Sequence, residues 1–130
     1  MNTREVVEKY YEYANAGQWD AWCDLFAEDA IFDEQLAGRI QGRETLRGMM
    51  KGFTPVAYAK FQNVPKHWVV EGNQAAVVSH ISARAAKYQD EPIEADATNF
   101  YQIENGQIKY IANFHDSKPF APFLKQIGAG

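Results

Sequence analysis

The chain has 130 residues, 46% of them hydrophobic and 23% charged, so residues 1–130 are expected to form one domain with a real core. Thirteen basic and seventeen acidic side chains give a formal net charge of −4, and no stripe of Lys and Arg exists, which disfavours binding to nucleic acid. The single cysteine excludes an internal disulfide and fits a reducing, cytoplasmic setting. Neither a signal peptide nor a membrane span of about 18 apolar residues is expected.

Apolar residues spaced by three and four predict three helices in the first half of the chain. Thr3 is the expected N-cap of the first helix, and Gly17 is its expected stop. A short strand at 30–32 separates the second helix from the third. The predicted helices cover 3–16, 19–26 and 45–53.

A change of period from 3.6 to 2 predicts four antiparallel strands in the second half. The Asn105-Gly106 dipeptide is the strongest hairpin signal in the chain. In the second of these strands Val77 and Ile81 share one face, and the alternate residues lie on the other. The tail after Pro119 is expected to be a short docked or frayed end. The predicted strands cover 61–71, 74–87, 93–104 and 107–115.

Helices followed by an antiparallel meander predict an α+β domain whose curved sheet wraps around the helices. The cone-shaped space between the two layers is where a small ligand would bind. The sequence contains no metal-ligand spacing and no glycine-rich phosphate loop, so neither a metal nor a cofactor is expected.

Three blocks of sequence, VVEKY at 6–10, NAG at 15–17 and LFAEDA at 25–30, resemble the N-terminal half of ketosteroid isomerase. That enzyme belongs to the NTF2-like superfamily, as do the SnoaL-like polyketide cyclases. The likeness is clearest over 3–53 and looser along 93–114. It implies a cone in which three N-terminal helices pack on a strongly curved antiparallel sheet. This superfold hosts isomerases, cyclases, dehydratases and binding modules without catalysis.

The resemblance also implies catalytic residues. Ketosteroid isomerases use a tyrosine and a protonated aspartic acid as an oxyanion hole, and a carboxylate that moves a proton between carbons. These positions fall on Tyr10, Asn99 and Glu34 of this sequence. An amide at Asn99 can donate a hydrogen bond to an oxyanion but has no acidic proton to share.

Glu34 ends a strand that leads into the expected cone, where desolvation disfavours a charged carboxylate and suits it to proton abstraction. The alternative is that Asp33 and Glu34 form a solvated turn, with only one of the two facing inward because strand side chains alternate.

His115 offers a second chemistry, because an imidazole near a carboxylate can act as an acid or base. Ile111, Asn113 and His115 are expected to share the strand face directed at the cone. Asp116 can orient His115 only if the strand has already ended. SnoaL-like cyclases and scytalone dehydratase resemble this arrangement loosely.

Aromatic side chains are abundant enough to line the cone as well as fill a core, which suits a small apolar carbonyl compound as the ligand. The ring-bearing candidates for ligand contact are Trp19, Trp22, Phe32, Phe53 and Tyr101, and Ile111 and Asn113 join them from the last strand.

The outer face of the sheet is expected to carry Val78, His80, Trp68 and Phe100, and a face this apolar predicts a homodimer formed through the sheet.

Three functions follow from this sequence. The first is a ketosteroid-isomerase-like enzyme in which Glu34 abstracts a proton, Tyr10 and Asn99 steady the enolate, and His115 assists. The second is a ligand-binding or accessory module without catalysis, which the amide at Asn99 favours. The third is a SnoaL-like cyclase or dehydratase centred on His115.

Overall fold

The first helix, α1 (Thr3–Asn15), begins with a reciprocal cap. The side chain of Asn2 accepts a hydrogen bond from the Glu5 amide at 2.9 Å, and the Glu5 carboxylate accepts one from the Asn2 amide at 3.0 Å. This capping box satisfies two N–H groups at the helix start. The expected cap at Thr3 is therefore wrong by one residue. The Thr3 hydroxyl instead donates to the carbonyl of Gly72 at 2.8 Å.

The second helix, α2 (Trp19–Asp24), is shorter than predicted, and the strand that follows it is longer. The strand β1 (Phe26–Glu34) begins at a residue that the sequence pattern assigns to the helix. Phe26 pairs with Ile108, and the Ile108 amide donates to the Leu25 carbonyl at 2.8 Å. Pairing with a residue 82 positions away in the sequence thus overrides the local helical spacing.

The third helix, α3 (Arg43–Met50), ends before the predicted stop at residue 53. The chain turns at Gly52, whose φ of +74° lies in the left-handed region that favours glycine. A short π-turn, η1 (Phe53–Ala57), then leads into the sheet. Phe53 consequently sits in this turn and not on a helix.

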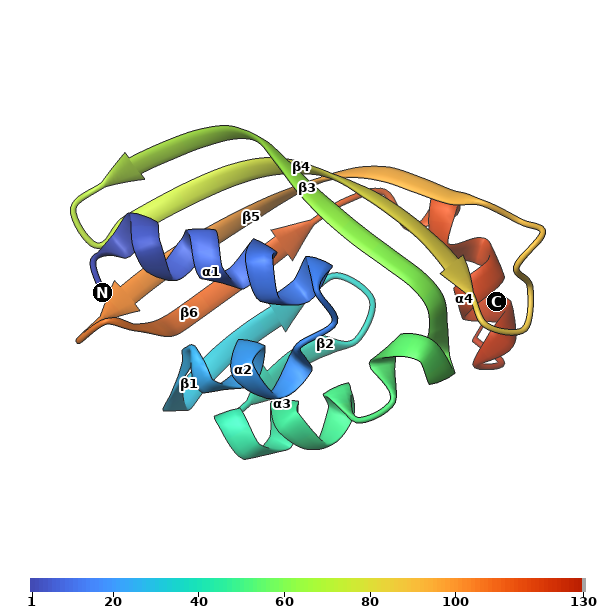
Figure 1. Cartoon of the computed structure of the whole chain (residues 1–130), viewed down its shortest axis with the longest axis horizontal. Coiled ribbons are helices and arrows are strands. Elements are labelled where there is room, and N and C mark those ends of the chain that lie inside the picture. Colours follow the sequence, from blue (N-terminus) through green and yellow to red (C-terminus); the bar gives the residue numbers. More distant parts are fainter. Residues whose placement is uncertain (130) are drawn as a thin grey trace.

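Six strands form one sheet in the order β2-β1-β6-β5-β4-β3 (Figure 1). All neighbours are antiparallel except β1 and β6, which are parallel. The four predicted strands are present, and β1 and β2 extend their sheet beyond the expected meander. The strands after β1 are β2 (Gly38–Gln41), β3 (Tyr58–Glu71), β4 (Gln74–Ala85), β5 (Ile93–Glu104) and β6 (Gln107–Phe114).

The inner face of the sheet packs against α1 and carries the buried residues. Val77 and Ile81 are buried on β4, whereas Val78 and His80 lie on the outer face, as their alternation predicts. The predicted outer position of Trp68 is wrong. A register shift between Pro65 and His67 brings Trp68 opposite the buried Val77, and its ring packs on Tyr11 with centroids 5.9 Å apart.

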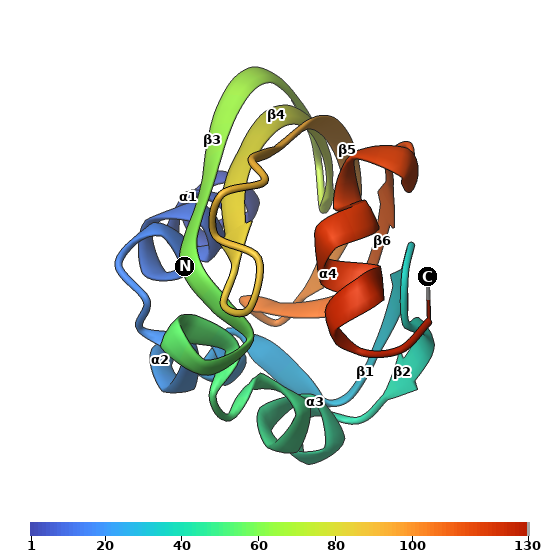
Figure 2. The same ribbon diagram turned by 90° about the vertical axis from the view of Figure 1, so that its right-hand side faces the viewer.

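The described residues, 1–129, end in a docked helical segment. A single turn, η2 (Lys118–Phe120), precedes the helix α4 (Ala121–Gln126), which lies beside the ends of the long strands (Figure 2). Of the two expectations for this tail, docked or frayed, the docked one is confirmed. No helix within 1–129 is long and apolar enough to cross a membrane.

Candidate functional site

A cavity of about 380 Å³ lies between the helices and the inner face of the curved sheet. This volume is within the range of small-molecule sites. Its walls are formed largely by aromatic and aliphatic side chains, with a few polar groups among them. Eight of the predicted site residues line it, namely Tyr10, Trp19, Trp22, Phe32, Glu34, Phe53, Asn113 and His115.

Three predicted site residues lie behind the wall of this cavity. Asn99, Tyr101 and Ile111 are all buried, with exposed fractions of 2% or less. They support the wall from the sheet side and do not line it. The role predicted for each of the eleven residues stays a prediction, because position alone does not establish chemistry.

Glu34 is the last residue of β1 and faces the cavity. Its Oε2 accepts hydrogen bonds from the amides of Leu36 at 2.8 Å and Ala37 at 2.5 Å. The carboxylate is thus held in place by the backbone of the β1–β2 turn. The sequence left open whether Asp33 or Glu34 faces the cone, and the strand places Glu34 there.

Asp33 points away from the cavity, because neighbouring strand residues face opposite sides. Its carboxylate accepts two hydrogen bonds from Arg39, at 2.8 and 2.9 Å, and one from the Tyr110 hydroxyl at 2.6 Å. These hydrogen bonds, Arg39 first, lower the pKa of Asp33 to about 2. Asp33 therefore remains ionised at neutral pH, and its contacts lie on the outer side of the strand.

Tyr10 faces the cavity from the middle of α1. Burial raises its pKa well above the ordinary value, and electrostatic interactions with Tyr11 and Glu34 raise it further, while hydrogen bonding to Asn99 and Tyr101 acts in the opposite direction. The hydroxyl therefore stays protonated at ordinary pH. A protonated phenol is a hydrogen-bond donor, which is the role that an oxyanion site needs.

Asn99 uses its amide to hold two phenols behind the wall. Its Nδ2 donates to the hydroxyls of Tyr11 at 3.2 Å and Tyr101 at 3.0 Å, and the Tyr101 hydroxyl donates to that of Tyr11 at 2.8 Å. Both rings pack against Tyr10, with centroids 5.0 and 5.3 Å away. Tyr11 belongs to this site although the sequence analysis did not single it out.

His115 lies just beyond the end of β6 and lines the cavity. Its Nδ1 is 2.8 Å from the backbone carbonyl oxygen of Asp116. Because a carbonyl only accepts, Nδ1 carries the proton, and in the neutral ring Nε2 keeps a free lone pair. The carboxylate of Asp116 instead accepts from the Lys118 amide at 3.0 Å. The backbone of Asp116, and not its side chain, orients this imidazole.

Two further polar groups on the cavity wall were not predicted from the sequence as hydrogen-bonding groups of the site. The indole nitrogen of Trp22 and the Oδ1 of Asn63 are buried and have no hydrogen-bond partner within residues 1–129. Asn63 occupies an inward position of β3, where the alternating pattern calls for an apolar residue. That mismatch of residue type and position is the signal in the sequence that marks it.

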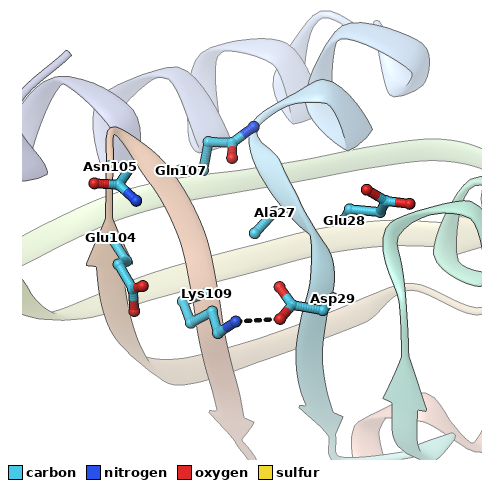
Figure 3. A pocket seen from close by; sticks show the side chains of 7 residues that line it. All are labelled: Ala27, Glu28, Asp29, Glu104, Asn105, Gln107 and Lys109. Atoms are coloured by element: carbon cyan, nitrogen blue, oxygen red, sulfur yellow. Dashed lines mark hydrogen bonds and ion pairs between the residues drawn. The ribbon is translucent and has the colours of Figure 1, made fainter.

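A second hollow, of about 630 Å³, opens to solvent at the other end of the sheet (Figure 3). It contains none of the predicted site residues. Lys109 and Asp29 form an ion pair across it, from β6 to β1. Its polar, open wall offers little apolar surface to a ligand. The other lining residues are Ala27, Glu28, Glu104, Asn105 and Gln107.

The described part of the chain contains no group of three His, Cys, Asp or Glu side chains that could hold a metal ion. The polar groups of the cavity are phenol, amide, imidazole, indole, the ammonium group of Lys51 and one carboxylate. Such a set can bind an oxygenated organic molecule and move a proton on it.

Solved structures similar to this chain share its fold. An NTF2-like protein of unknown function from Burkholderia pseudomallei is 15% identical, with 92% of this chain and 95% of that one covered and a TM-score of 0.81. A protein of ketosteroid isomerase-like fold from Catenulispora acidiphila, solved with trimethylamine, is 16% identical, with coverages of 98% and 95% and a TM-score of 0.80. IdmH from Streptomyces antibioticus, described as a candidate polyketide cyclase, is 19% identical, with coverages of 98% and 99% and a TM-score of 0.77.

At such identities these likenesses establish the NTF2-like fold alone. No curated protein matches the chain by sequence. The sequence model of the SnoaL-like domain, however, matches residues 7–111, which span all the helices and strands from α1 to most of β6. Both the expected fold and the expected superfamily are confirmed. This protein therefore belongs to the SnoaL-like domain family of NTF2-like proteins.

Proposed function

We propose that this protein binds an apolar carbonyl compound in the cavity and moves a proton on it. Glu34 takes a proton from the carbon next to the carbonyl; the electron pair of that C–H bond forms the C=C bond of the enolate, and the π pair of the carbonyl moves onto its oxygen. Tyr10 donates a hydrogen bond to this oxygen, and the protonated Glu34 then returns the proton to carbon. His115 assists from the far end of β6.

One observation carries the proposal. Glu34 and Tyr10 lie in the wall of the same largely apolar cavity. A carboxylate base and a neutral hydrogen-bond donor that line one cavity are the two groups that enolisation requires. In this proposal Asn99 is a positioning residue, because it touches the phenols behind Tyr10 and lies outside the cavity wall.

The test follows the exchange of hydrogen for deuterium beside the carbonyl of 1-tetralone, an enolisable bicyclic ketone, by proton NMR in D₂O. Glu34→Gln should slow the catalysed exchange by about a hundredfold or more, since it removes the base. The amide oxygen of Gln can still accept the turn hydrogen bonds from Leu36 and Ala37. Asp33→Asn, on the outward side of the same strand, is the matched control and should leave the exchange unchanged. Wild-type rates in Glu34→Gln would refute the assignment.

A second candidate, a cyclase or dehydratase centred on His115, is supported by the free Nε2 lone pair that its contact with the Asp116 backbone leaves. His115→Ala would then abolish turnover of enolisable ketones, while Glu34→Gln would leave it intact.

The third candidate, a module without catalysis, rests on Asn99 standing where an acid would stand in ketosteroid isomerases. In that case 1-tetralone would raise the melting temperature and show no catalysed exchange.

A homodimer through the outer face of the sheet is also proposed. The register aligns Val69, Ala76 and Phe100 into an apolar row across three strands, and Tyr110 packs beside Phe100 with centroids 6.4 Å apart. A second copy of the chain can cover this row with the same row of its own. Phe100→Lys should convert the dimer to a monomer in light scattering, and an already monomeric wild-type chain would contradict the proposal.

A further inference from the structure

The cavity wall contains one donor and one acceptor that no protein group satisfies within residues 1–129. These are the buried indole N–H of Trp22, a residue that is 3% exposed, and the buried Oδ1 of Asn63, a residue that is 6% exposed. A buried polar atom without a partner is destabilising, because it has lost its hydrogen bonds to water and gained none. The neighbouring indole of Trp19 shows the usual solution, because its N–H donates to the Thr54 hydroxyl at 2.7 Å.

Asn63 presents its amide from a backbone that is firmly held. The side chain of Asn15 accepts from the Asn63 amide nitrogen at 2.6 Å and donates to the Asn63 carbonyl at 2.9 Å. These two bonds fix the strand against the end of α1 and use only backbone atoms of Asn63. Asn63 lines the cavity, and its side-chain Oδ1 has no hydrogen-bond partner within residues 1–129.

Trp22 and Asn63 flank the same part of α1. The Trp22 ring packs on Tyr10, with centroids 5.3 Å apart, and Asn63 is bonded to Asn15 little more than one turn later. Glu34, by contrast, lies on β1, which is separated from β3 by three strands in the order of the sheet. The cavity wall thus includes polar groups from β1 and polar groups from α2 and β3.

Building on the proposed function, we propose that Trp22 and Asn63 form a second polar subsite that binds a hydroxyl group of the ligand. A hydroxyl group both accepts and donates hydrogen bonds, so it can accept one from the indole N–H of Trp22 and donate one to the Oδ1 of Asn63. A ketone or ether oxygen only accepts, and an ammonium group only donates. The preferred ligand is then a hydroxylated carbonyl compound, with its carbonyl at Tyr10 and Glu34 and its hydroxyl group at this subsite.

The test compares two probes that differ by one hydroxyl group, 1-tetralone and 6-hydroxy-1-tetralone, with affinities measured by titration calorimetry on the whole chain. The wild-type protein should bind the hydroxylated ketone at least about five- to tenfold more tightly, which is the effect of one neutral hydrogen bond and a lower bound for the two that the subsite offers. Asn63→Leu, of similar volume, removes the acceptor and keeps only the Trp22 donor, so its preference for the hydroxylated ketone should be smaller than that of the wild-type protein. Asn73→Leu, at the exposed β3–β4 turn, is the matched control and should keep the wild-type preference.

Thermal melts establish that Asn63→Leu is folded, and Asn63→Ala replaces it if it is not. The wild-type comparison needs no variant and decides by itself: equal affinity for the two ketones overturns the subsite. An unchanged preference in Asn63→Leu also overturns it. A preference for the hydroxylated ketone without catalysed exchange would refute proton transfer and leave the subsite standing. Catalysed exchange without that preference would refute the subsite alone. Failure of both ketones to bind would refute both proposals.

Discussion

The side chains of Tyr11, Tyr101 and Asn99 form a hydrogen-bonded cluster behind the cavity wall. Its three side chains satisfy most of one another's hydrogen-bonding groups in a buried setting. Burial raises the pKa of Tyr11 to about 12, so its hydroxyl stays neutral over the working range of pH. Neutral phenols can hold Tyr10 by packing without placing a competing charge beside Glu34.

Tyr101→Phe tests this cluster. The change removes one hydroxyl and leaves the Asn99 amide and the Tyr11 hydroxyl each short of one buried partner, so we expect the free energy of unfolding to fall by about 1 to 3 kcal/mol. Urea denaturation followed by tryptophan fluorescence measures it. Tyr13→Phe, at a partly exposed ring on α1, should change the free energy of unfolding by much less. Equal effects from the two variants would show that the network contributes nothing.

Individual site residues could be predicted from the sequence where their place in a strand or helix pattern agreed with the chemical type of the side chain. Glu34 could be identified as a candidate base, but choosing it over Asp33 required the exact strand phase and the partners of each carboxylate. Asn63 and Trp22 were harder to recognise as a pair, because they are 41 positions apart and only the fold brings both to one wall. Trp68 was misplaced because a bulge, which shifts the side-chain alternation, leaves no clear signature in the residues around it.

Strands were predicted more accurately than helix ends at the scale of elements. The bounds of β5 match the expectation, since its period of two is unbroken and a strong turn dipeptide follows it. The start of β1 and the end of α3 were missed because they depend on distant contacts. Pairing with β6 recruits residues that have helical spacing, and the turn at Gly52 ends the helix before the apolar pattern does.

The β4–β5 pair carries a pH-sensitive contact on its outer face. The two ring nitrogens of His80 lie 2.8 Å from the Asp96 carboxylate and 3.1 Å from that of Glu94. These hydrogen bonds, Asp96 first, raise the pKa of His80 above its ordinary value of 6.5. A raised folded-state pKa gives a stabilisation that is complete below the unfolded value and is lost as the pH rises through the folded one.

His80→Gln should therefore lower the melting temperature at about pH 5.5 and change it less at about pH 9, where the wild-type ring has already lost its charge. Melting curves at the two pH values measure the difference. His67→Gln, at an exposed position of the neighbouring strand, is the control and should show no such dependence. A loss of stability that is the same at both pH values would show that the protonated ring contributes nothing.

At the scale of the whole molecule, the last helix completes the cavity that the sheet and the first helices begin. Phe120, Phe123 and Ile127 line it from η2, α4 and the residue after α4. Phe123 also stacks on Tyr58 at the start of β3, with ring centroids 4.8 Å apart. The start of β3 and the helix α4 thus meet at one wall of the cavity.

Gln126 fastens this wall to the sheet. Its Oε1 accepts from the Lys87 amide at 2.7 Å, and its Nε2 donates to the Ala57 carbonyl at 2.9 Å, so one side chain bridges α4 to the ends of β4 and η1. Gln126→Ala removes both hydrogen bonds. We expect α4 to separate from the sheet more often, because local opening costs less free energy when fewer contacts must break. The Ile127 amide donates to the Phe123 carbonyl at 3.1 Å, at the end of α4, and keeps this acceptor in the variant; its hydrogen exchange should accelerate by about tenfold, the effect of roughly 1.4 kcal/mol.

Lys125→Ala is the matched control on the same helix. It removes an ion pair with Glu91 that is half exposed on both sides and a contact of the ammonium with the Tyr88 ring, 4.0 Å from its centroid; exposed interactions of these kinds contribute about 0 to 1 kcal/mol each. The Ile127 amide should therefore stay nearly as protected as in the wild-type protein. If both variants accelerate its exchange equally, the helix is held by its general contact with the sheet. If only Gln126→Ala does so, a single side-chain amide controls how often α4 opens at this wall of the cavity.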